Sequence, residues 1–340
     1  MGQSLGVCLL GCGQIAPVHA AAWRREAGVR LWTCDAVAER ASQLAAAVGA
    51  EGVFSALQQA LASPEVQVVD ICLPHDQHLE AAVQSAAAGK HLLVEKPLTR
   101  TVAEADTLLA AVRRAGVECM VGECFRYAPP VVRACAAIAA GDIGEVFLIQ
   151  VNTLQRHHPV TFRRDRAITG GGVLIDRGIH FVDVLYQLGG AVRSVAALEA
   201  RGGITEMEGE DTACLQVRFA SGAVGQLAVS WGTWRGRIDA GADRAAGAPP
   251  IPWFSVFGSR GTLYDLDGLH LVTESEPSAR RLVAGLPDPR LIEVEIADYA
   301  AALREGRPAP VPAEVGREDL RIVAAAYRSM ETQAVVSLDG

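Results

Sequence analysis

The sequence lacks any run of about 20 consecutive apolar residues, the length that a membrane-spanning helix requires. It also lacks a basic excess, because its 340 residues include 31 Lys and Arg against 39 Asp and Glu, a formal net charge of −8. Nucleic-acid phosphates favour a basic face, so we expect no nucleic-acid partner. The first residues, Met1 to Ser4, lack the positive region that begins a signal peptide. The sequence therefore predicts a soluble, cytoplasmic protein with no membrane partner.

The eight cysteines also lack the spacing of a metal site. None forms a CxxC pair, and none is grouped with histidines as zinc ligands are. Most lie inside apolar runs such as Val68 to Cys72, where a free cysteine behaves as a small buried hydrophobe. We therefore expect no metal site.

The chain is long enough for two domains of roughly 150 residues each. Its first 125 residues alternate short apolar runs with Ala-rich helical segments, which predicts βαβ units around a parallel sheet. The predicted strands cover residues 5–10, 29–34, 66–73, 91–95 and 118–121. After Tyr127, apolar runs follow one another through turns, which predicts an open antiparallel sheet with one face packed on helices. The clearest signals there are strands at 146–151, 213–219, 224–230 and 254–257, and helices at 173–188 and 314–331.

A glycine-rich turn follows the first predicted strand and directly precedes a helix. It reads Gly11-Cys12-Gly13-Gln14-Ile15-Ala16, where Gly11 permits a tight turn and Gly13 lets the backbone approach a pyrophosphate. The phosphates would bind the free N–H groups at the start of the helix, near Gln14 and Ile15. Alone, the motif is equally consistent with a tight turn that binds nothing.

Asp35 ends the second predicted strand, 22 positions after Gly13. A carboxylate at this point accepts hydrogen bonds from the adenosine ribose hydroxyls and repels the additional phosphate of NADP. The glycine turn and Asp35 together predict an NAD site.

Two further segments follow strands of the predicted parallel sheet. One contains Leu73-Pro74-His75 and, shortly after, His78, and the other is Glu95-Lys96-Pro97. Ligands of open α/β sheets bind at the carboxyl ends of the strands, so these residues are candidates for cofactor binding. Lys96 would bring a charge to the crevice, although an exposed loop lysine is the alternative, and Pro97 allows a cis peptide bond.

A polar pair interrupts the apolar helix predicted at 173–188. Asp176 and His180 are four positions apart, so a helix places them on one face, and three glycines at 170–172 allow close backbone approach before it. The alternative is a helix with a few polar residues facing solvent. Polar residues among apolar neighbours favour a functional role.

In combination, these motifs resemble the Gfo/Idh/MocA family of nicotinamide-dependent oxidoreductases. The resemblance covers the whole chain and rests on Gly11-x-Gly13-x-x-Ala16, Glu95-Lys96-Pro97, Asp176-x-x-x-His180, Gly258-x-x-Gly261-Thr262 and the final helix through Tyr327 and Ser329. It implies an NAD(P)-binding Rossmann domain at residues 1–124. It also implies a substrate-binding and oligomerisation domain at 125–340, with a large, mostly antiparallel open sheet that forms the face of a homodimer or homotetramer.

The resemblance also implies hydride transfer between NAD and a secondary hydroxyl or ketone of a polyhydroxylated substrate: a sugar, aminosugar, cyclitol or glycoside. Lys96, Asp176 and His180 match the catalytic trio, with His180 as general base, although Lys96 takes the proton in some members. Many relatives have Thr-Pro-Asn where this chain has Leu73-Pro74-His75, so we expect His75 to contact the cofactor differently. Candidates for the substrate pocket are Arg126, Tyr127, His157, Arg163, Arg177 and Trp231. A surface role is the alternative for Arg126, Tyr127, His157 and Arg163, and a place in the sheet-face core at a subunit interface is the alternative for Trp231.

Two other functions are compatible with the resemblance. Some relatives hydrolyse glycosides through transient oxidation by tightly held NAD. A non-catalytic dinucleotide-binding regulator is the third hypothesis, but a sensor has no need for Lys96 and His180 together.

Overall fold

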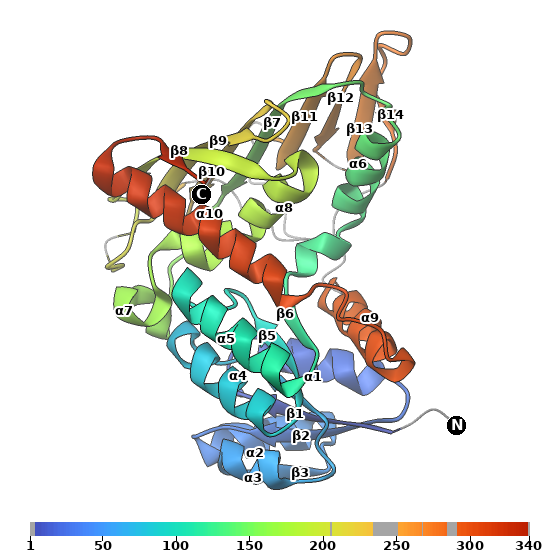
Figure 1. Ribbon diagram of the computed structural model, residues 1–340, viewed down its shortest axis with the longest axis vertical. Coiled ribbons are helices and arrows are strands. Elements are labelled where there is room, and N and C mark those ends of the chain that lie inside the picture. The colour runs from blue at the N-terminus through green and yellow to red at the C-terminus, as the bar shows by residue number, and fades with distance from the viewer. Residues whose placement is uncertain (1–3, 205, 234–250, 267, 284–290, 339–340) are drawn as a thin grey trace. The chain divides into compact units, whose positions relative to one another are not determined.

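The computed structural model describes residues 4–204, 206–233, 251–266, 268–283 and 291–338 (Figure 1). The chain forms two compact units, which are Met1–Cys124 with Arg290–Glu318, and Phe125–Pro289 with Asp319–Gly340. The expected boundary assigned all residues after 124 to a second domain, whereas the chain returns to the first unit at 290–318. Within the described ranges, no helix has both the length and the apolar character needed to cross a membrane.

The first unit contains a six-stranded parallel sheet, as the sequence predicts. Its order is β3-β2-β1-β4-β5-β6, and the order reverses between β1 and β4, the point where doubly wound sheets bind ligands. The strands are β1 (Leu5–Leu10), β2 (Val29–Cys34), β3 (Gly52–Phe54), β4 (Val68–Ile71), β5 (His91–Glu95) and β6 (Cys119–Gly122). The short, partly exposed β3 carries no apolar run, which explains why the sequence does not reveal it.

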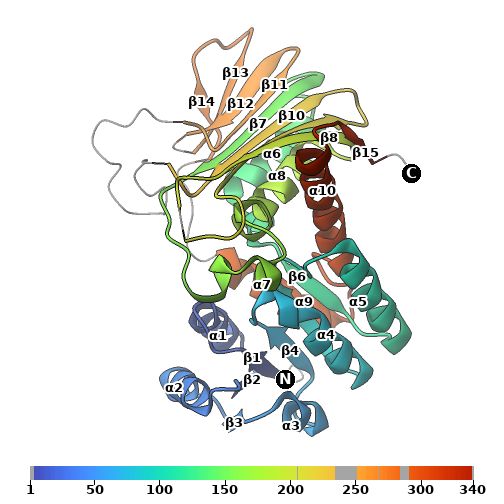
Figure 2. The same cartoon turned by 90° about the vertical axis from the view of Figure 1, so that its left-hand side faces the viewer.

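Helices cover both faces of this sheet. Figure 2 shows α1 (Ala16–Arg25) and α2 (Ala38–Val48) on one face, and α3 (Leu57–Ala62), α4 (His78–Ala87) and α5 (Val102–Ala115) on the other. The six residues of β1 are all buried, as expected of a strand covered from both sides.

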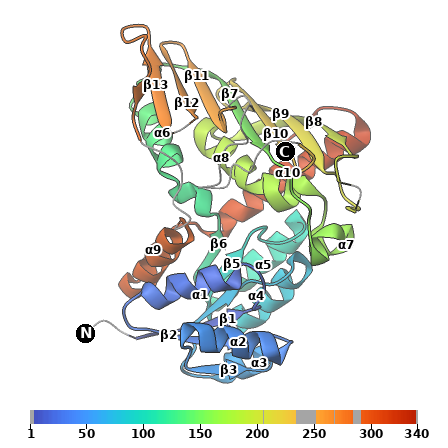
Figure 3. The same cartoon turned by 180° about the vertical axis from the view of Figure 1, so that it is seen from behind.

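A segment late in the chain completes the first unit. Helix α9 (Leu291–Glu305) packs beside α1 (Figure 3). The Tyr299 hydroxyl donates to the carbonyl oxygen of Leu92 at 2.8 Å, and the Val121 N–H donates to the carbonyl oxygen of Val311 at 3.0 Å. These bonds attach residues 291–311 to β5 and β6.

The second unit contains a nine-stranded sheet, and the prediction of a large, mostly antiparallel sheet is confirmed. Its order is β14-β13-β12-β11-β7-β10-β9-β8-β15, and the pairing of β7 with β10 is parallel. The strands are β7 (Val146–Leu154), β8 (Val192–Ala200), β9 (Thr212–Phe219), β10 (Val224–Ser230), β11 (Phe254–Gly258), β12 (Gly261–Asp265), β13 (Leu269–Thr273), β14 (Arg280–Arg281) and β15 (Val336–Ser337).

The two faces of this sheet differ. Helices α6 (Pro129–Ala139), α8 (Ile179–Gly189) and α10 (Ala313–Thr332) lie on one face (Figure 2), over buried side chains such as Val151 and Leu227. On the other face, Leu198 is 71% exposed and lies beside Cys214, and a row of glutamines crosses three strands. The register places Gln216, Gln226 and Gln150 side by side.

Candidate functional site

The glycine turn between β1 and α1 is shaped by contacts that exclude side chains. Gly11 has a φ of +91°, and a Cβ at this position would lie 2.6 Å from the carbonyl oxygen of Cys72, so glycine is required. A Cβ at Gly13 would meet no described atom within 4 Å, so the loop is open on that side. Ile15, which precedes α1, supplies no side-chain cap to the helix. An open loop before uncapped backbone N–H groups fits a dinucleotide pyrophosphate.

Asp35 is fixed against this loop by two backbone hydrogen bonds. Its Oδ2 accepts the N–H of Cys12 at 2.7 Å, and its Oδ1 accepts the N–H of Val37 at 2.7 Å. A carboxylate has roughly four acceptor positions, so these bonds leave capacity for ribose hydroxyls. Burial and the charge of Asp35 raise the pKa of the Cys12 thiol to about 12, so the thiol stays neutral beside the cofactor loop.

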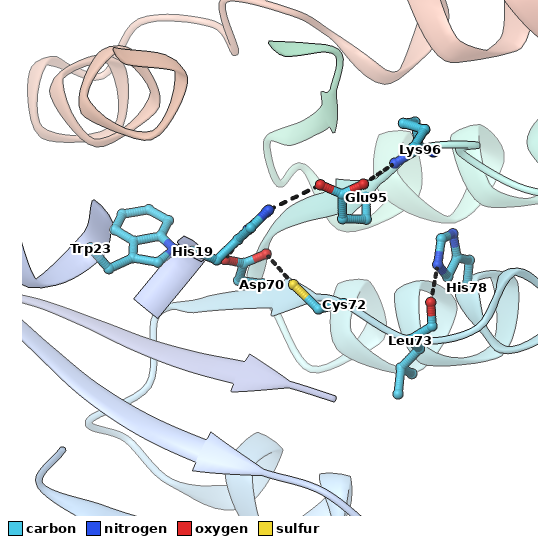
Figure 4. A network of polar contacts seen from close by, with 8 residues as sticks. All are labelled: His19, Trp23, Asp70, Cys72, Leu73, His78, Glu95 and Lys96. Atoms are coloured by element: carbon cyan, nitrogen blue, oxygen red, sulfur yellow. Dashed lines mark hydrogen bonds and ion pairs between the residues drawn. The ribbon is translucent and has the colours of Figure 1, made fainter. Parts of the chain in front are cut away.

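His78 connects the segments that follow β4 and β5. Its ring is fully buried, and Nδ1 lies 2.8 Å from the carbonyl oxygen of Pro97. Nε2 lies 2.9 Å from the carbonyl oxygen of Leu73 (Figure 4). Burial lowers the pKa of this imidazole. The predicted cofactor residue His78 thus links the backbones of the two candidate segments, and His75 beside it is also buried. The bond between Lys96 and Pro97 is a cis peptide.

The segment that carries Asp176 and His180 is not the single α-helix predicted at 173–188. Leu174–Gly178 forms a five-residue π-helical turn, and α8 starts at Ile179. Such turns occur frequently at functional sites. Asp176 lies on the π turn and His180 on the first turn of α8, and both are buried, with exposed fractions of 4% and 7%.

The glycines before the π turn permit the close approach that the sequence predicts. A Cβ at Gly171 would lie 2.1 Å from the hydroxyl of Tyr327, and one at Gly172 would lie 2.2 Å from the carbonyl oxygen of Glu210. The Glu210 carboxylate accepts the N–H of Leu174 at 3.0 Å and the hydroxyl proton of Tyr327 at 2.9 Å. The Tyr327 hydroxyl in turn accepts the N–H of Gly172 at 3.1 Å. Glu210 and Tyr327 therefore hold the turn that carries Asp176.

Arginines neutralise two of the acids around this turn. Arg163 Nε lies 3.1 Å from Oδ2 of Asp176, which forms an ion pair between a predicted substrate residue and a predicted catalytic one. Arg126 contacts Asp183 with its Nε 3.0 Å from each carboxylate oxygen. Gln187 also donates to Asp183, at 2.8 Å. Asp183 is therefore held by Arg126 and Gln187 one turn after His180.

Phe125, which the sequence did not single out, is the aromatic neighbour of His180. Its ring meets the His180 imidazole edge-on, with the centroids 5.1 Å apart. The guanidinium of Arg177 lies 5.7 Å from the Phe125 ring and 5.2 Å from the Phe181 ring, within cation–π range. Tyr127 shares the short helical turn of Phe125.

The last two candidates for the substrate pocket are aromatic neighbours. His157 and Trp231 have centroids 4.9 Å apart, and Trp231 is 3% exposed. The structure thus places Asp176, Arg177 and His180 on one segment of the second unit, and Arg163 is ion-paired with Asp176. Lys96 belongs to the first unit, with Glu95 and Pro97.

Comparisons with known proteins identify relatives of this chain. Residues 5–123 match a family described as "Oxidoreductase family, NAD-binding Rossmann fold", and residues 131–264 match "GFO/IDH/MocA C-terminal domain". Levoglucosan dehydrogenase of Pseudarthrobacter phenanthrenivorans is 30% identical over 261 residues, which are 66% of this chain and 67% of that protein. Myo-inositol 2-dehydrogenase of Thermotoga maritima is 25% identical over 344 residues, which are 97% of this chain and 98% of that protein.

A solved structure extends the similarity to the whole fold. It is levoglucosan dehydrogenase in complex with NADH and levoglucosan, with a TM-score of 0.87 at 25% identity. The alignment covers 99% of this chain and 100% of that chain.

Tyr327→Phe tests how the π turn is held. Because the variant removes the hydroxyl between Glu210 and Gly172, the free energy of unfolding should fall by about 1 kcal/mol, measured by urea denaturation. Tyr264→Phe is the matched control, since Tyr264 lies in β12 and stacks on His270. An equal change in the two variants would contradict the role of the Tyr327 hydroxyl.

Proposed function

Because the chain belongs to the Gfo/Idh/MocA family of oxidoreductases, with an NAD-binding Rossmann domain, we propose that it is an NAD-dependent dehydrogenase acting on a CH–OH group. Its substrate is a sugar, aminosugar, cyclitol or glycoside. The observation that carries this proposal is the Asp176–His180 segment on its π turn, in a chain that aligns over its full length with a sugar dehydrogenase bound to NADH. The turn at Gly11 and Gly13 and the carboxylate of Asp35 would hold NAD, which would supply the acceptor for the hydride of the carbinol carbon. A base of this chain would take the hydroxyl proton.

We propose His180 as that base. An imidazole has an ordinary pKa of about 6.5, which suits proton transfer from a hydroxyl near neutral pH. The aromatic edge of Phe125 keeps the ring of His180 in place. Asp176, paired with Arg163, orients the substrate hydroxyls, and Lys96 stabilises the developing alkoxide. If Lys96 takes the proton instead, His180 keeps an orienting role.

The pocket residues divide by what they contact. Arg163 and Arg177 carry charge beside Asp176 and Phe125, so we assign them to substrate binding. Arg126 is ion-paired with Asp183, and Trp231 is buried against His157. We therefore assign Arg126, His157 and Trp231 to the walls of the substrate pocket. Tyr127 follows Arg126 on the same turn.

A substrate screen tests the proposed activity. Levoglucosan, myo-inositol, simple sugars, aminoglycosides and methyl glycosides are each incubated with NAD, and NADH is followed by its absorbance. We expect at least one polyol to yield one NADH for each ketone formed. Cleavage of a glycoside without net NADH would contradict the dehydrogenase and indicate a hydrolase, and binding of NAD without turnover of any polyol would indicate a regulator.

His180→Ala should lower turnover far more than it weakens NAD binding. General acid–base groups typically contribute about 10²- to 10⁴-fold to the rate, and this group acts on the proton only in the transition state. Turnover and the dissociation constant of NADH are measured side by side. His158→Ala, at an exposed histidine of the same unit, is the control. Near-full turnover in His180→Ala would move the base role to Lys96.

NAD should bind more tightly than NADP by at least about tenfold, because the Asp35 carboxylate repels a 2′-phosphate. Asp35→Ser should reduce the preference for NAD over NADP, although it also weakens the binding of both cofactors by releasing the N–H of Cys12. Glu39→Gln, which removes an exposed charge at the start of α2, is the control and should leave the ratio unchanged. If the wild type binds NAD and NADP equally, for example because Arg40 holds the 2′-phosphate, the assignment of Asp35 as the residue that selects NAD is contradicted.

We further propose that the protein is a homodimer or homotetramer in which the outer face of the nine-stranded sheet meets a second copy. This face carries exposed Leu198 and the row of Gln150, Gln216 and Gln226. Glutamine side chains donate and accept hydrogen bonds, so such a row can pair with the same row of a second copy.

The eight cysteines are all free thiols, so we propose that the protein works in the reducing cytoplasm.

Leu198→Lys should weaken this association, because it places a charge in a partly apolar contact. Light scattering at micromolar concentration gives the mass. Val132→Lys, at an exposed position of α6 on the other side of the sheet, is the control and should keep the mass of the wild type. A monomeric wild type would refute the interface.

A further inference from the structure

His19 lies in the middle of a buried polar chain within the first unit. It is on α1, three positions after Ala16, and its side chain is fully buried. Nδ1 is 2.9 Å from Oδ2 of Asp70 on β4, and Nε2 is 2.9 Å from Oε1 of Glu95 at the end of β5 (Figure 4). One imidazole therefore connects a helix with two strands.

The contacts of His19 indicate its charge. A neutral imidazole donates one hydrogen bond and would turn a lone pair toward the second carboxylate, whereas an imidazolium donates to both. Burial alone would lower the pKa of His19, but the charge of Asp70 outweighs it and raises the pKa well above the usual range. Trp23 donates to the same Asp70 oxygen at 2.7 Å, which fixes that carboxylate from a second direction.

Other titratable groups face this cluster. The Sγ of Cys72, directly after β4, lies 3.7 Å from Oδ1 of Asp70, and Glu123 follows β6. Glu295 on α9 is fully buried, and burial together with the charge of Glu95 raises its pKa well above the usual range. His19, Asp70 and Cys72 lie close enough together to form a metal site, but their atoms contact one another and need no ion.

This series of buried polar contacts reaches the backbone N–H of Lys96. Glu95 accepts from His19 with Oε1, and its other oxygen, Oε2, accepts the N–H of Lys96 at 3.1 Å. A carboxylate held at both oxygens cannot rotate without breaking one of these bonds. Glu95 therefore transmits the position of His19 to the residue that carries the proposed catalytic amine.

We propose that His19 is a positioning residue for Lys96, acting through Glu95. This inference rests on the proposed dehydrogenase function, in which Lys96 stabilises the alkoxide. A buried cation between Asp70 and Glu95 keeps Glu95 extended toward the Lys96 N–H and fixes the backbone from which the lysine side chain starts. Small displacements of a catalytic group cost up to about 10²-fold in rate.

His19→Gln is the main test, because glutamine keeps hydrogen-bonding capacity but carries no charge. The first readout is hydrogen exchange of the Lys96 amide, which should become about five- to tenfold faster when Glu95 is released. The second is kinetic, with the polyol that the wild type oxidises fastest. Turnover should fall about 10- to 100-fold, with a much smaller change in NADH affinity.

A double-mutant cycle separates positioning from a general structural role. In the Lys96→Ala background, His19→Gln should change turnover by less than about twofold, because two residues that act through one group are not additive. His91→Gln is the matched control, since His91 lies at the opposite end of β5 and its Nδ1 accepts the Glu118 N–H. It should leave exchange at Lys96 unchanged. If His19→Gln does not fold, Asp70→Asn takes its place, because it removes the carboxylate that favours the charged form of His19. Exchange at Lys96 and turnover should then change in the same directions as in His19→Gln, but by smaller factors.

Each outcome decides the proposal. Normal exchange of the Lys96 amide in His19→Gln overturns it whatever the activity, and so does an additive loss of turnover in the double variant. If the wild type oxidises no polyol, the proposed function fails, and the exchange measurement alone then decides whether His19 positions Lys96.

Discussion

The arrangement of the second unit depends on a steric constraint at Gly171 and Gly172. Neither position has space for a Cβ, because the Tyr327 hydroxyl and the Glu210 backbone occupy it. The resulting hydrogen bonds start a π turn where an α-helix would otherwise begin, and this turn determines the position of Asp176 and the first turn of α8. A larger residue at either glycine would displace the whole segment.

Both units place charge in their interior and pair it there. Asp183 is held by Arg126, and Asp176 by Arg163, while His19 lies between two carboxylates. Isolated buried charges are costly, and paired ones cost much less. The arginines that appear in the sequence as possible surface groups are therefore counter-charges for buried acids.

Much of the fold follows from local patterns. The strands β1, β2, β4, β5 and β6 are apolar runs bounded by turns, and the alternation of strand and helix predicts the Rossmann sheet. β3 was not predictable, because its three residues pair with β2 without a buried face of their own. The predicted helix at 173–188 did not reveal its π turn, because that turn arises from contacts with Glu210 and Tyr327, distant in sequence.

The candidate site shows the same division. Gly11, Asp35, Lys96 and His180 belong to short motifs with a chemical rationale, so the sequence alone predicts them as site residues. Phe125, Glu210 and His19 matter through partners far along the chain, and spacing carries no signal for such pairs. For His19, the sequence offers one sign, a histidine between apolar residues at the start of the helix that follows the glycine turn.

The return of residues 290–318 to the first unit has a consequence for biosynthesis. Helix α9 and the strand-like contact of Val311 with Val121 cover β5 and β6, and they emerge from the ribosome only after residues 125–289 of the second unit. Domains commonly fold in order from the N-terminus during translation. The N-terminal unit therefore stays incomplete until about nine-tenths of the chain has been made. Until then, the edge strand β6 lacks the cover of α9 and the hydrogen bond to Val311.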